Sequence, residues 1–410
     1  MKNDRQTVID NEELMNSALA DMNDDYNSFY DSVSVIFRFI SFILFAALLF
    51  YVISASFLAA DRFSYSNLEF ITRNFALTLE ENKDSARHPI RYNPDSNNQF
   101  DLFGDGLAVC GNSVISIYSA TGRQTCSEFL QYRSPLMVTS DKYVLIYDEG
   151  TGEYCIFNSF TKVYSGTIDH PIKSAVISDS GYFALISSSA EYTSTVEVYD
   201  NDFSLIRRYN KNGYVSAVDI SDNEILIATA DTELEDNSFK VELLHSYLDA
   251  DKPDFTLTTS AGMPLCVKIA DEGHFAVFSD SVVCLDSNGN IRGKYDFEGK
   301  MFYDFSVSPS NALIVFKSMG MGVEYNLVCL DKHASAVYEK VVSETVFDIA
   351  LYQSTSLVLT ETGIECFNAN FNEVIEVESS SYGCSLLTLD NGKIYYCSET
   401  TAMLIDRATD

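Results

Sequence analysis

The stretch PLCVKIADEGHFAVFSDSVVCLDSNGNIRGKYDF, residues 264–297, contains four short apolar runs separated by turns. The runs PLCVKIA, HFAVFS, SVVCLD and IRGKYDF place apolar side chains at alternate positions, which is the period of a β-strand. The separators DEG and SNGN contain Gly and Asn, which tolerate the positive φ that tight turns need. The stretch therefore predicts a small antiparallel sheet of four strands.

The same order of runs recurs from residue 98 onward. A turn follows the first run of each unit, at intervals of about 41 residues, and the turns fall at Asp105, Asp141, Gly181, Asn223, Gly273, Asn311, Ser354 and Asn391. One four-stranded sheet per interval is typical of a β-propeller blade. A two-domain β-sandwich does not explain one period that persists over about 300 residues.

The last unit lacks a fourth strand, because CSLLTLD, KIYYCSE and TAMLID are followed only by RATD. Far upstream, HPIRY at residues 88–92 is a strand-like run without a neighbouring partner. Joining the last sheet to the first removes exposed edges, so we expect HPIRY to be the outer strand of the eighth blade. The predicted fold class is all-β, an eight-bladed β-propeller over residues 88–410. A seven-bladed ring is the alternative if the first or last unit forms no separate blade.

Three segments precede the repeats. Residues 1–32 are rich in Asp and Glu and predict a disordered acidic tail. FISFILFAALLFYVISASFLAA, residues 39–60, has no charged side chain and as a helix spans about 33 Å, enough for a hydrocarbon core of about 30 Å. Residues 33–62 therefore predict a single transmembrane helix, with a cleaved signal peptide as the alternative. Residues 63–87 predict a juxtamembrane helix or a stalk.

The charge balance excludes one class of partner. The formal net charge is -32, with 59 carboxylate side chains against 27 Lys and Arg. Binding to phosphate backbones requires clustered basic residues that displace counterions. We therefore expect no nucleic-acid partner.

Motifs for catalysis, metals and cofactors are absent from the sequence. The nine cysteines form no Cys-x-x-Cys pair and lie mostly within apolar runs. We therefore predict that they are buried core residues. There is no zinc-protease, serine-hydrolase or phosphate-loop motif, and DSNGN at residues 286–290 reads as a hairpin turn rather than a calcium loop. We predict no cofactor and no metal. Distant residues that converge on the axis of a propeller remain a possible source of a catalytic site.

Three long connections give a candidate binding surface. Residues 187–195, 228–238 and 317–325 each join the second and third runs of a unit, so they emerge on one face of the propeller. The second connection is acidic, and the third combines a base with methionines, which suits a protein or peptide partner. The alternative is that these are solvated hairpin tips. The candidate partner-binding residues are Asp231, Glu233, Glu235, Asp236, Lys317, Met319 and Met321.

The start of the chain together with HPIRYNP, VISDSGYFALISSSAEYTSTVEVYD and NGYVSAVDIS resembles an uncharacterised family of single-span, propeller-like membrane proteins of Gram-positive bacteria. The resemblance implies a cytoplasmic N-terminal tail and an extracytoplasmic propeller in the cell membrane. It carries over no functional residue. Cysteines that form no evident disulfide pairs favour a cytosolic propeller instead, unless the protein keeps its thiols buried.

Two classes of function follow from these patterns. The first is a membrane-anchored, non-catalytic propeller that binds or scaffolds a protein, peptide or cell-wall component. The second is a cell-envelope enzyme, a glycan hydrolase or lyase that uses carboxylates at the propeller axis.

Overall fold

The computed structural model describes residues 33–50, 89–94, 98–235, 238–270, 272–318, 320, 322–377, 384–389 and 391–405, and side chains 232–238 are not described. The chain divides into two compact units, Met1–Thr72 and Arg73–Asp410. The tail expected at residues 1–32 and the stalk expected at 63–87 lie outside the described residues.

The first unit contributes an apolar helix, Val33–Phe50. Its 18 residues have a mean hydropathy of 2.5, and none of this helix is buried within the protein. The helix is long and apolar enough to cross a membrane, and a signal sequence near an N-terminus would have the same properties. The C-terminal part of the expected span lies outside the described residues.

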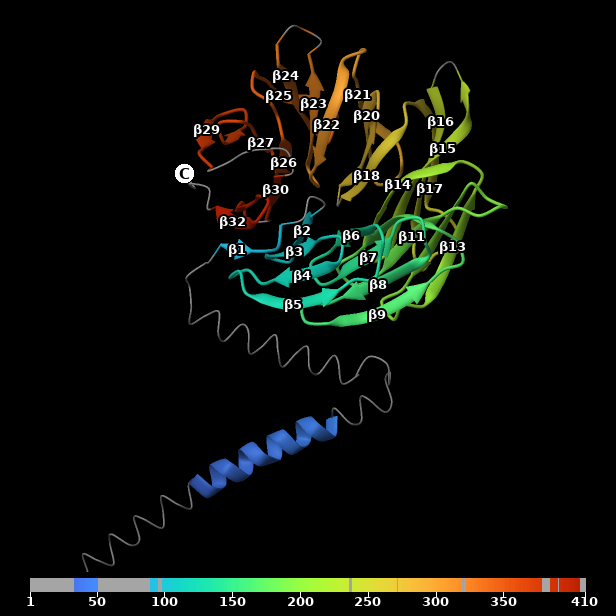
Figure 1. Ribbon diagram of the computed structural model, residues 1–410. Helices are drawn as coiled ribbons and strands as arrows, with labels where there is room; N and C mark the ends of the chain where they lie inside the picture. The colour runs from blue at the N-terminus through green and yellow to red at the C-terminus, as the bar shows by residue number, and fades with distance from the viewer. Residues whose placement is uncertain are drawn as a thin grey trace, which may run out of the picture. The chain divides into compact units, whose positions relative to one another are not determined.

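The second unit is an eight-bladed β-propeller (Figure 1). Its strands form eight four-stranded sheets in which every pairing is antiparallel, so the seven-bladed alternative is wrong. Within a blade we call the strands A to D from the axis outward. Blades 1 to 4 consist of β2 Gln99–Phe103, β3 Gly106–Cys110, β4 Val114–Tyr118, β5 Gln124–Phe129; β6 Pro135–Thr139, β7 Val144–Asp148, β8 Glu153–Phe157, β9 Lys162–Thr167; β10 Ile172–Ile177, β11 Phe183–Ser187, β12 Ser194–Tyr199, β13 Leu205–Lys211; and β14 Tyr214–Ile220, β15 Glu224–Glu235, β16 Ser238–Tyr247, β17 Phe255–Ala261. Blades 5 to 8 consist of β18 Pro264–Ala270, β19 Gly273–Phe278, β20 Ser281–Leu285, β21 Ile291–Asp296; β22 Met301–Val307, β23 Asn311–Lys317, β24 Tyr325–Asp331, β25 Ala336–Val342; β26 Asp348–Tyr352, β27 Thr355–Leu359, β28 Ile364–Phe367, β29 Asn372–Ile375; and β30 Ser385–Thr388, β31 Ile394–Cys397, β32 Thr401–Ile405, β1 Ile90–Arg91.

The N-terminal strand closes the ring as the sequence predicts. Ile90 pairs with Ala402 of β32, and the Tyr92 hydroxyl donates to the Ser398 carbonyl oxygen at 2.5 Å. The Ile90 side chain is only 2% exposed, so this strand also fills core volume. Closure removes the free edge that β32 would otherwise present to other chains.

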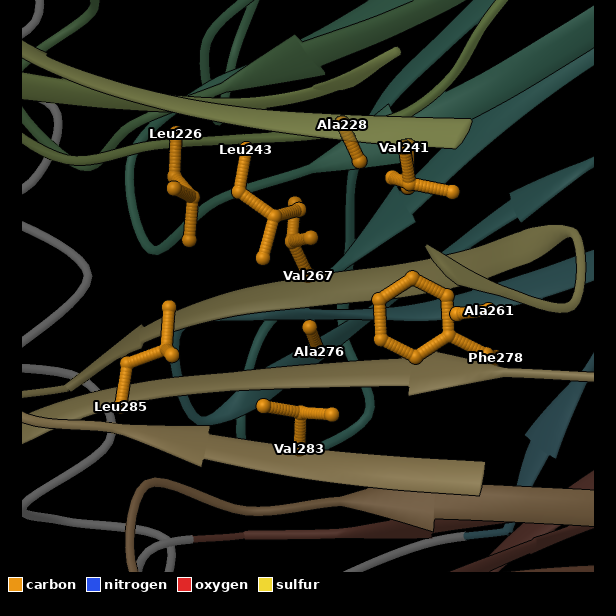
Figure 2. Close-up of a cluster of buried hydrophobic side chains, with 11 residues drawn as sticks. Leu226, Ala228, Val241, Leu243, Ala261, Val267, Ala276, Phe278, Val283 and Leu285 are labelled. Carbon is orange, nitrogen blue, oxygen red and sulfur yellow. The ribbon is translucent and has the colours of Figure 1, made fainter. Parts of the chain in front are cut away.

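The hydrophobic core lies between neighbouring blades. Strands B and C are buried along their length, as in β3 and β20, whereas the outer strand β17 alternates partly buried and exposed positions. This burial pattern follows from geometry, because the middle strands are covered on both sides and the outer strands face water on one. Figure 2 shows the seam between blades 4 and 5, where Leu243 of β16 packs near Val267 and Ala276.

The cysteines occupy this core as predicted. All nine are free thiols, and all except the partly exposed Cys266 are buried. Burial raises the pKa of Cys155 and of Cys266 to about 11 and that of Cys284 to about 12, so these groups stay protonated at neutral pH.

Candidate functional site

The strand order gives the propeller two chemically different faces. The A–B and C–D turns lie at one end of the strands, which we call the turn face. The B–C connections and the links from one blade to the next lie at the other end, which we call the loop face. The candidate residues that the structure describes, Asp231, Glu233, Glu235 and Lys317, belong to the loop face.

On the turn face, short side chains hold the turns themselves. Asp200 Oδ1 accepts hydrogen bonds from the amides of Asp202 at 3.0 Å and Ser204 at 2.8 Å. The same arrangement recurs at the C–D turns of other blades, with Asn158, Asp286, Asp331 and Asn368 as acceptors. These are Asx turns, in which the side chain substitutes for a backbone acceptor. The turn-face acceptors therefore have a structural role.

The acidic connection of blade 4 is an extended hairpin rather than a loop. β15 and β16 have 12 and 10 residues, and Leu234 pairs with Phe239 and Glu235 with Ser238. The prediction of a connecting loop over residues 228–238 was wrong, because strand pairing continues through it. A register shift between Ala230 and Leu234 leaves extra residues on β15, which form a bulge.

The acidic candidates lie on this hairpin, which we call the acidic arm. Asp231 is exposed in the bulge, and Glu233 and Glu235 occupy later positions on β15. Asp236 lies outside the described residues. The arm therefore carries carboxylates beyond the end of the blade.

The third connection forms a corner of aromatic and apolar side chains around Lys317, which we call the Lys317 corner. The Lys317 ammonium lies 5.8 Å from the ring centroid of Tyr303 and 5.8 Å from that of Tyr325. The two rings pack edge to face with centroids 4.9 Å apart. Met301, the cross-strand partner of Lys317, is 50% exposed, and Val323 on the same connection is 46% exposed. The predicted Met319 and Met321 lie outside the described residues.

Sequence reasoning missed Met301, Tyr303 and Tyr325. Met301 and Tyr325 are the cross-strand partners of Lys317 on either side, so correct strand register would have identified them. Tyr303 is different, because it is the extra residue at a register shift between Phe302 and Asp304. This bulge turns the Tyr303 side chain toward Lys317, and the repeat pattern gave no signal of it.

The remaining long connection, in blade 3, borders a polar hollow of about 200 Å³. Arg208 and the 8% exposed Glu197 form an ion pair at 2.5 Å in its wall, and the Tyr199 hydroxyl donates to Glu197 at 2.9 Å. The Arg208–Glu197 pair is neutral, whereas Asp169 and Glu191 add two exposed carboxylates to the lining of this hollow.

Exposed carboxylates dominate the loop face. Among the described residues, the exposed basic side chains on its connections include Arg133, Lys300 and Lys317. The exposed carboxylates on the described parts of the same connections include Glu149, Asp169, Glu191, Asp231, Asp280, Glu298, Glu324, Glu361, Glu376 and Glu399. The excess of negative charge favours a partner with basic groups.

Carboxylates on the inner A strands mostly join neighbouring blades. Asp219 accepts a hydrogen bond from the Ile269 amide at 2.7 Å, and Asp348 accepts one from the Leu386 amide at 2.7 Å. Among the described residues, Asp304 accepts no such hydrogen bond from the next blade and accepts one from the amide of its own neighbour Phe305 at 2.7 Å. Burial raises the pKa of Asp304, and burial also raises that of Asp348, with a smaller contribution from the Asp304 charge.

Two histidines that are far apart in the sequence meet at the seam between blades 4 and 5. The rings of His245 and His274 lie 4.8 Å apart and are 1% and 5% exposed. His245 Nε2 lies 2.7 Å from a Glu224 carboxylate oxygen, whereas both ring nitrogens of His274 are buried without a hydrogen-bond partner among the described residues. Within the same part of the chain, no group of three or more His, Cys, Asp or Glu side chains is arranged to hold a metal ion.

The chain belongs to the family of unknown function DUF5711, whose model matches residues 82–403. The match covers the propeller from before its closing strand to its last blade. Among curated proteins, no sequence relative matches.

Solved structures share the fold at low sequence identity. BamB from Moraxella catarrhalis is 12% identical with a TM-score of 0.54, and the match covers 77% of this chain and 98% of that one. Sqt1 from Saccharomyces cerevisiae is 11% identical with a TM-score of 0.55, covering 78% and 98%. The computationally designed protein Ika8 is 12% identical with a TM-score of 0.56, covering 77% and 96%. At these identities the likeness establishes the fold alone.

Proposed function

We propose that this protein is a membrane-anchored, non-catalytic propeller that binds a protein, peptide or cell-wall component through its loop face. The observation that carries the proposal is the Lys317 corner, where the exposed Met301 is the cross-strand partner of Lys317 and the exposed Tyr303 ring lies 5.8 Å from its ammonium. Exposed apolar side chains rimmed by polar ones are typical of interaction surfaces. The acidic arm stands on the same face.

The proposed partner segment is basic and contains at least one apolar side chain. Carboxylates of the loop face attract its basic groups and raise the rate of encounter. The apolar side chain packs against Met301 and Tyr303, where removal of apolar area from water supplies affinity. Lys317 restricts which partner segments can bind, because its ammonium repels a basic group placed next to it.

The anchor and its orientation are part of the proposal. The apolar helix Val33–Phe50 supports a single membrane span, and the family resemblance supports a propeller outside the cytoplasm. A cysteine at position 235, made by Glu235→Cys in the acidic arm, tests the orientation with a membrane-impermeant maleimide on intact cells. We expect labelling above that of the parent protein, and labelling only after lysis would place the propeller inside.

Photo-crosslinking in cells tests the binding surface. We would place a photoreactive amino acid at Val323 on the loop face and, as matched control, at the exposed Asn370 on the turn face. The expected result is a discrete cross-linked product from position 323 that is largely lost in Met301→Ser and absent from position 370. Products of equal yield from both positions would reject the loop face as the binding surface.

The second candidate is an envelope enzyme, and one observation favours it. Asp304 and Asp348 lie on adjacent inner strands, and both have raised pKa values, as general acids do. If Asp304→Asn and Asp348→Asn abolished a glycan-cleaving activity without changing the cross-link from position 323, the enzyme would replace the binding module.

A further inference from the structure

A pocket on the turn face lies away from the proposed binding surface. It has a volume of about 540 Å³ and opens between blades 5 and 6. This volume is within the range of roughly 300–1,000 Å³ that small-molecule sites occupy. The pocket forms where the end of β18 and the start of β19 face the turns of blade 6.

The floor of the pocket is apolar and well packed. Phe275 and Leu285 contribute to it and are 3% and 1% exposed. Gly273 forms part of the wall with φ +142, and an added Cβ would lie 2.1 Å from the Leu285 carbonyl oxygen. Only glycine fits there, so this part of the wall is bare backbone.

The rim of the pocket carries cations in a protein whose net charge is -32. Arg292 comes from β21, and Lys332 and His333 come from the C–D turn of blade 6. Lys332 forms an ion pair with Glu272 across the seam, and both side chains are largely exposed. An exposed pair of this kind is weak and exchanges readily with another anion.

Arg292 forms no hydrogen bond or ion pair with the part of the chain that the structure describes. Hydrogen bonds from Asn290 lower the pKa of the nearby Asp286, and the charge of Arg292 makes a smaller contribution. The carboxylates near it are occupied, because Asp286 accepts from the amides of Asn288 and Asn290, and Asp331 accepts from the His333 amide. The guanidinium is therefore available to bind a carboxylate or phosphate in bidentate geometry.

We propose that the pocket between blades 5 and 6 binds an amphipathic anion, a small molecule with an apolar body and one carboxylate, sulfonate or phosphate group. The apolar body lies on Phe275 and Leu285, and the anionic group lies between Arg292 and Lys332. Phe275 and Leu285 exclude a fully polar ligand, and the negative charge of the whole protein disfavours a polyanion.

Binding of para-trifluoromethylbenzoate, followed by fluorine NMR, tests this proposal. The full-length protein would be held in micelles of an uncharged detergent, with empty micelles as the blank. We expect saturable binding with a Kd about tenfold lower than that of para-trifluoromethylbenzyl alcohol, which lacks the charge. Equal affinities for the acid and the alcohol, or no saturable binding of the acid, would overturn the proposal.

Two rim variants should move the affinity in opposite directions. Arg292→Gln is expected to weaken binding of the benzoate about tenfold, since it removes the charged donor. Glu272→Gln is expected to strengthen binding about threefold, because it frees Lys332 from its competing carboxylate. Lys142→Gln, on the A–B turn of blade 2, is the matched control and should leave Kd unchanged. If Arg292→Gln fails to fold, an unchanged or weaker affinity in Glu272→Gln overturns the proposal.

Discussion

The turn face and the loop face contain the same kinds of polar side chain but use them differently. On the turn face, Asp331 and its counterparts accept amide hydrogen bonds from their own turns, and Asp179 accepts the amide of Asp141 in the next blade at 2.7 Å. On the loop face, Glu324 is exposed on the longer connection between β23 and β24. A carboxylate within two residues of a tight turn is engaged by the backbone, whereas one on a longer connection remains available to a partner.

This contrast predicts that turn-face changes lower stability and loop-face changes lower binding. The predictions below test the contrast in order of expected size, beginning with the buried histidines beside the turn face.

Acid is expected to destabilise the seam between blades 4 and 5. Burial lowers the pKa of His274 to about 4, and the neighbouring His245 adds to the effect, while the carboxylates of Glu224, Asp254 and Asp286 oppose it. An ordinary histidine has a pKa near 6.5, so the unfolded chain takes up the proton first as pH falls. Stability from neutral His274 is therefore complete above about pH 6.5 and is lost toward pH 4, a loss of roughly 3 kcal/mol.

Urea unfolding at about pH 7.5 and about pH 4.5 measures this loss. His274→Leu should show a pH-dependent loss smaller by roughly 3 kcal/mol than the parent protein. His170→Gln, a change at an exposed loop-face histidine, should retain the full loss. An identical loss in the parent and His274→Leu would mean that His274 does not titrate as described.

Removing an Asx acceptor from the turn face should cost about 2 kcal/mol of unfolding free energy. In Asp331→Ala, the amides of His333 and Ser335 lose their acceptor. The matched loop-face change Glu324→Ala should alter stability by less than about 0.5 kcal/mol. Chemical denaturation compares the two variants, and equal losses would remove the distinction between the faces.

Substitutions of the two inner-strand carboxylates Asp304 and Asp348 should change the free energy of unfolding in opposite directions. Because burial raises the pKa of Asp304 above its usual 3.8, its charge opposes folding at neutral pH, and Asp304→Asn should stabilise the folded state. This gain should vanish as pH falls below the usual pKa, where Asp304 is protonated in both states. Asp348→Ala should destabilise by about 1 kcal/mol, since it removes the acceptor for the Leu386 amide. Thermal unfolding at two pH values measures both effects, and destabilisation by Asp304→Asn would show that its charge supports the fold.

The local periodicity of the sequence was sufficient to predict the number of blades and the strand that closes the ring. Alternating apolar positions, regularly spaced turns and the isolated HPIRY run together predict eight blades closed by the N-terminal strand, and the structure has this arrangement. The hairpin turn predicted at Gly289 is also present, with φ +80. Each of these features depends on residues that are close in sequence or on the closure of a regular ring.

The site was less predictable because it depends on irregularities in that pattern. The Tyr303 bulge and the bulge after Ala230 interrupt strand register, and periodicity carries no information on either. The contact between His245 and His274 joins two blades, and so does the ion pair between Glu272 and Lys332. Such contacts between blades require side-chain positions that sequence spacing does not supply.

The most direct test of the two-face model measures partner cross-linking and stability on one pair of variants. Met301→Ser changes an exposed side chain of the Lys317 corner, and Asp331→Ala changes a turn-face acceptor. With the photoreactive group at position 323, we predict that Met301→Ser loses most of the cross-linked product and keeps its unfolding free energy. Asp331→Ala should keep the product and lose stability. The model would be contradicted if Met301→Ser kept the full yield or if Asp331→Ala lost the product while still folded.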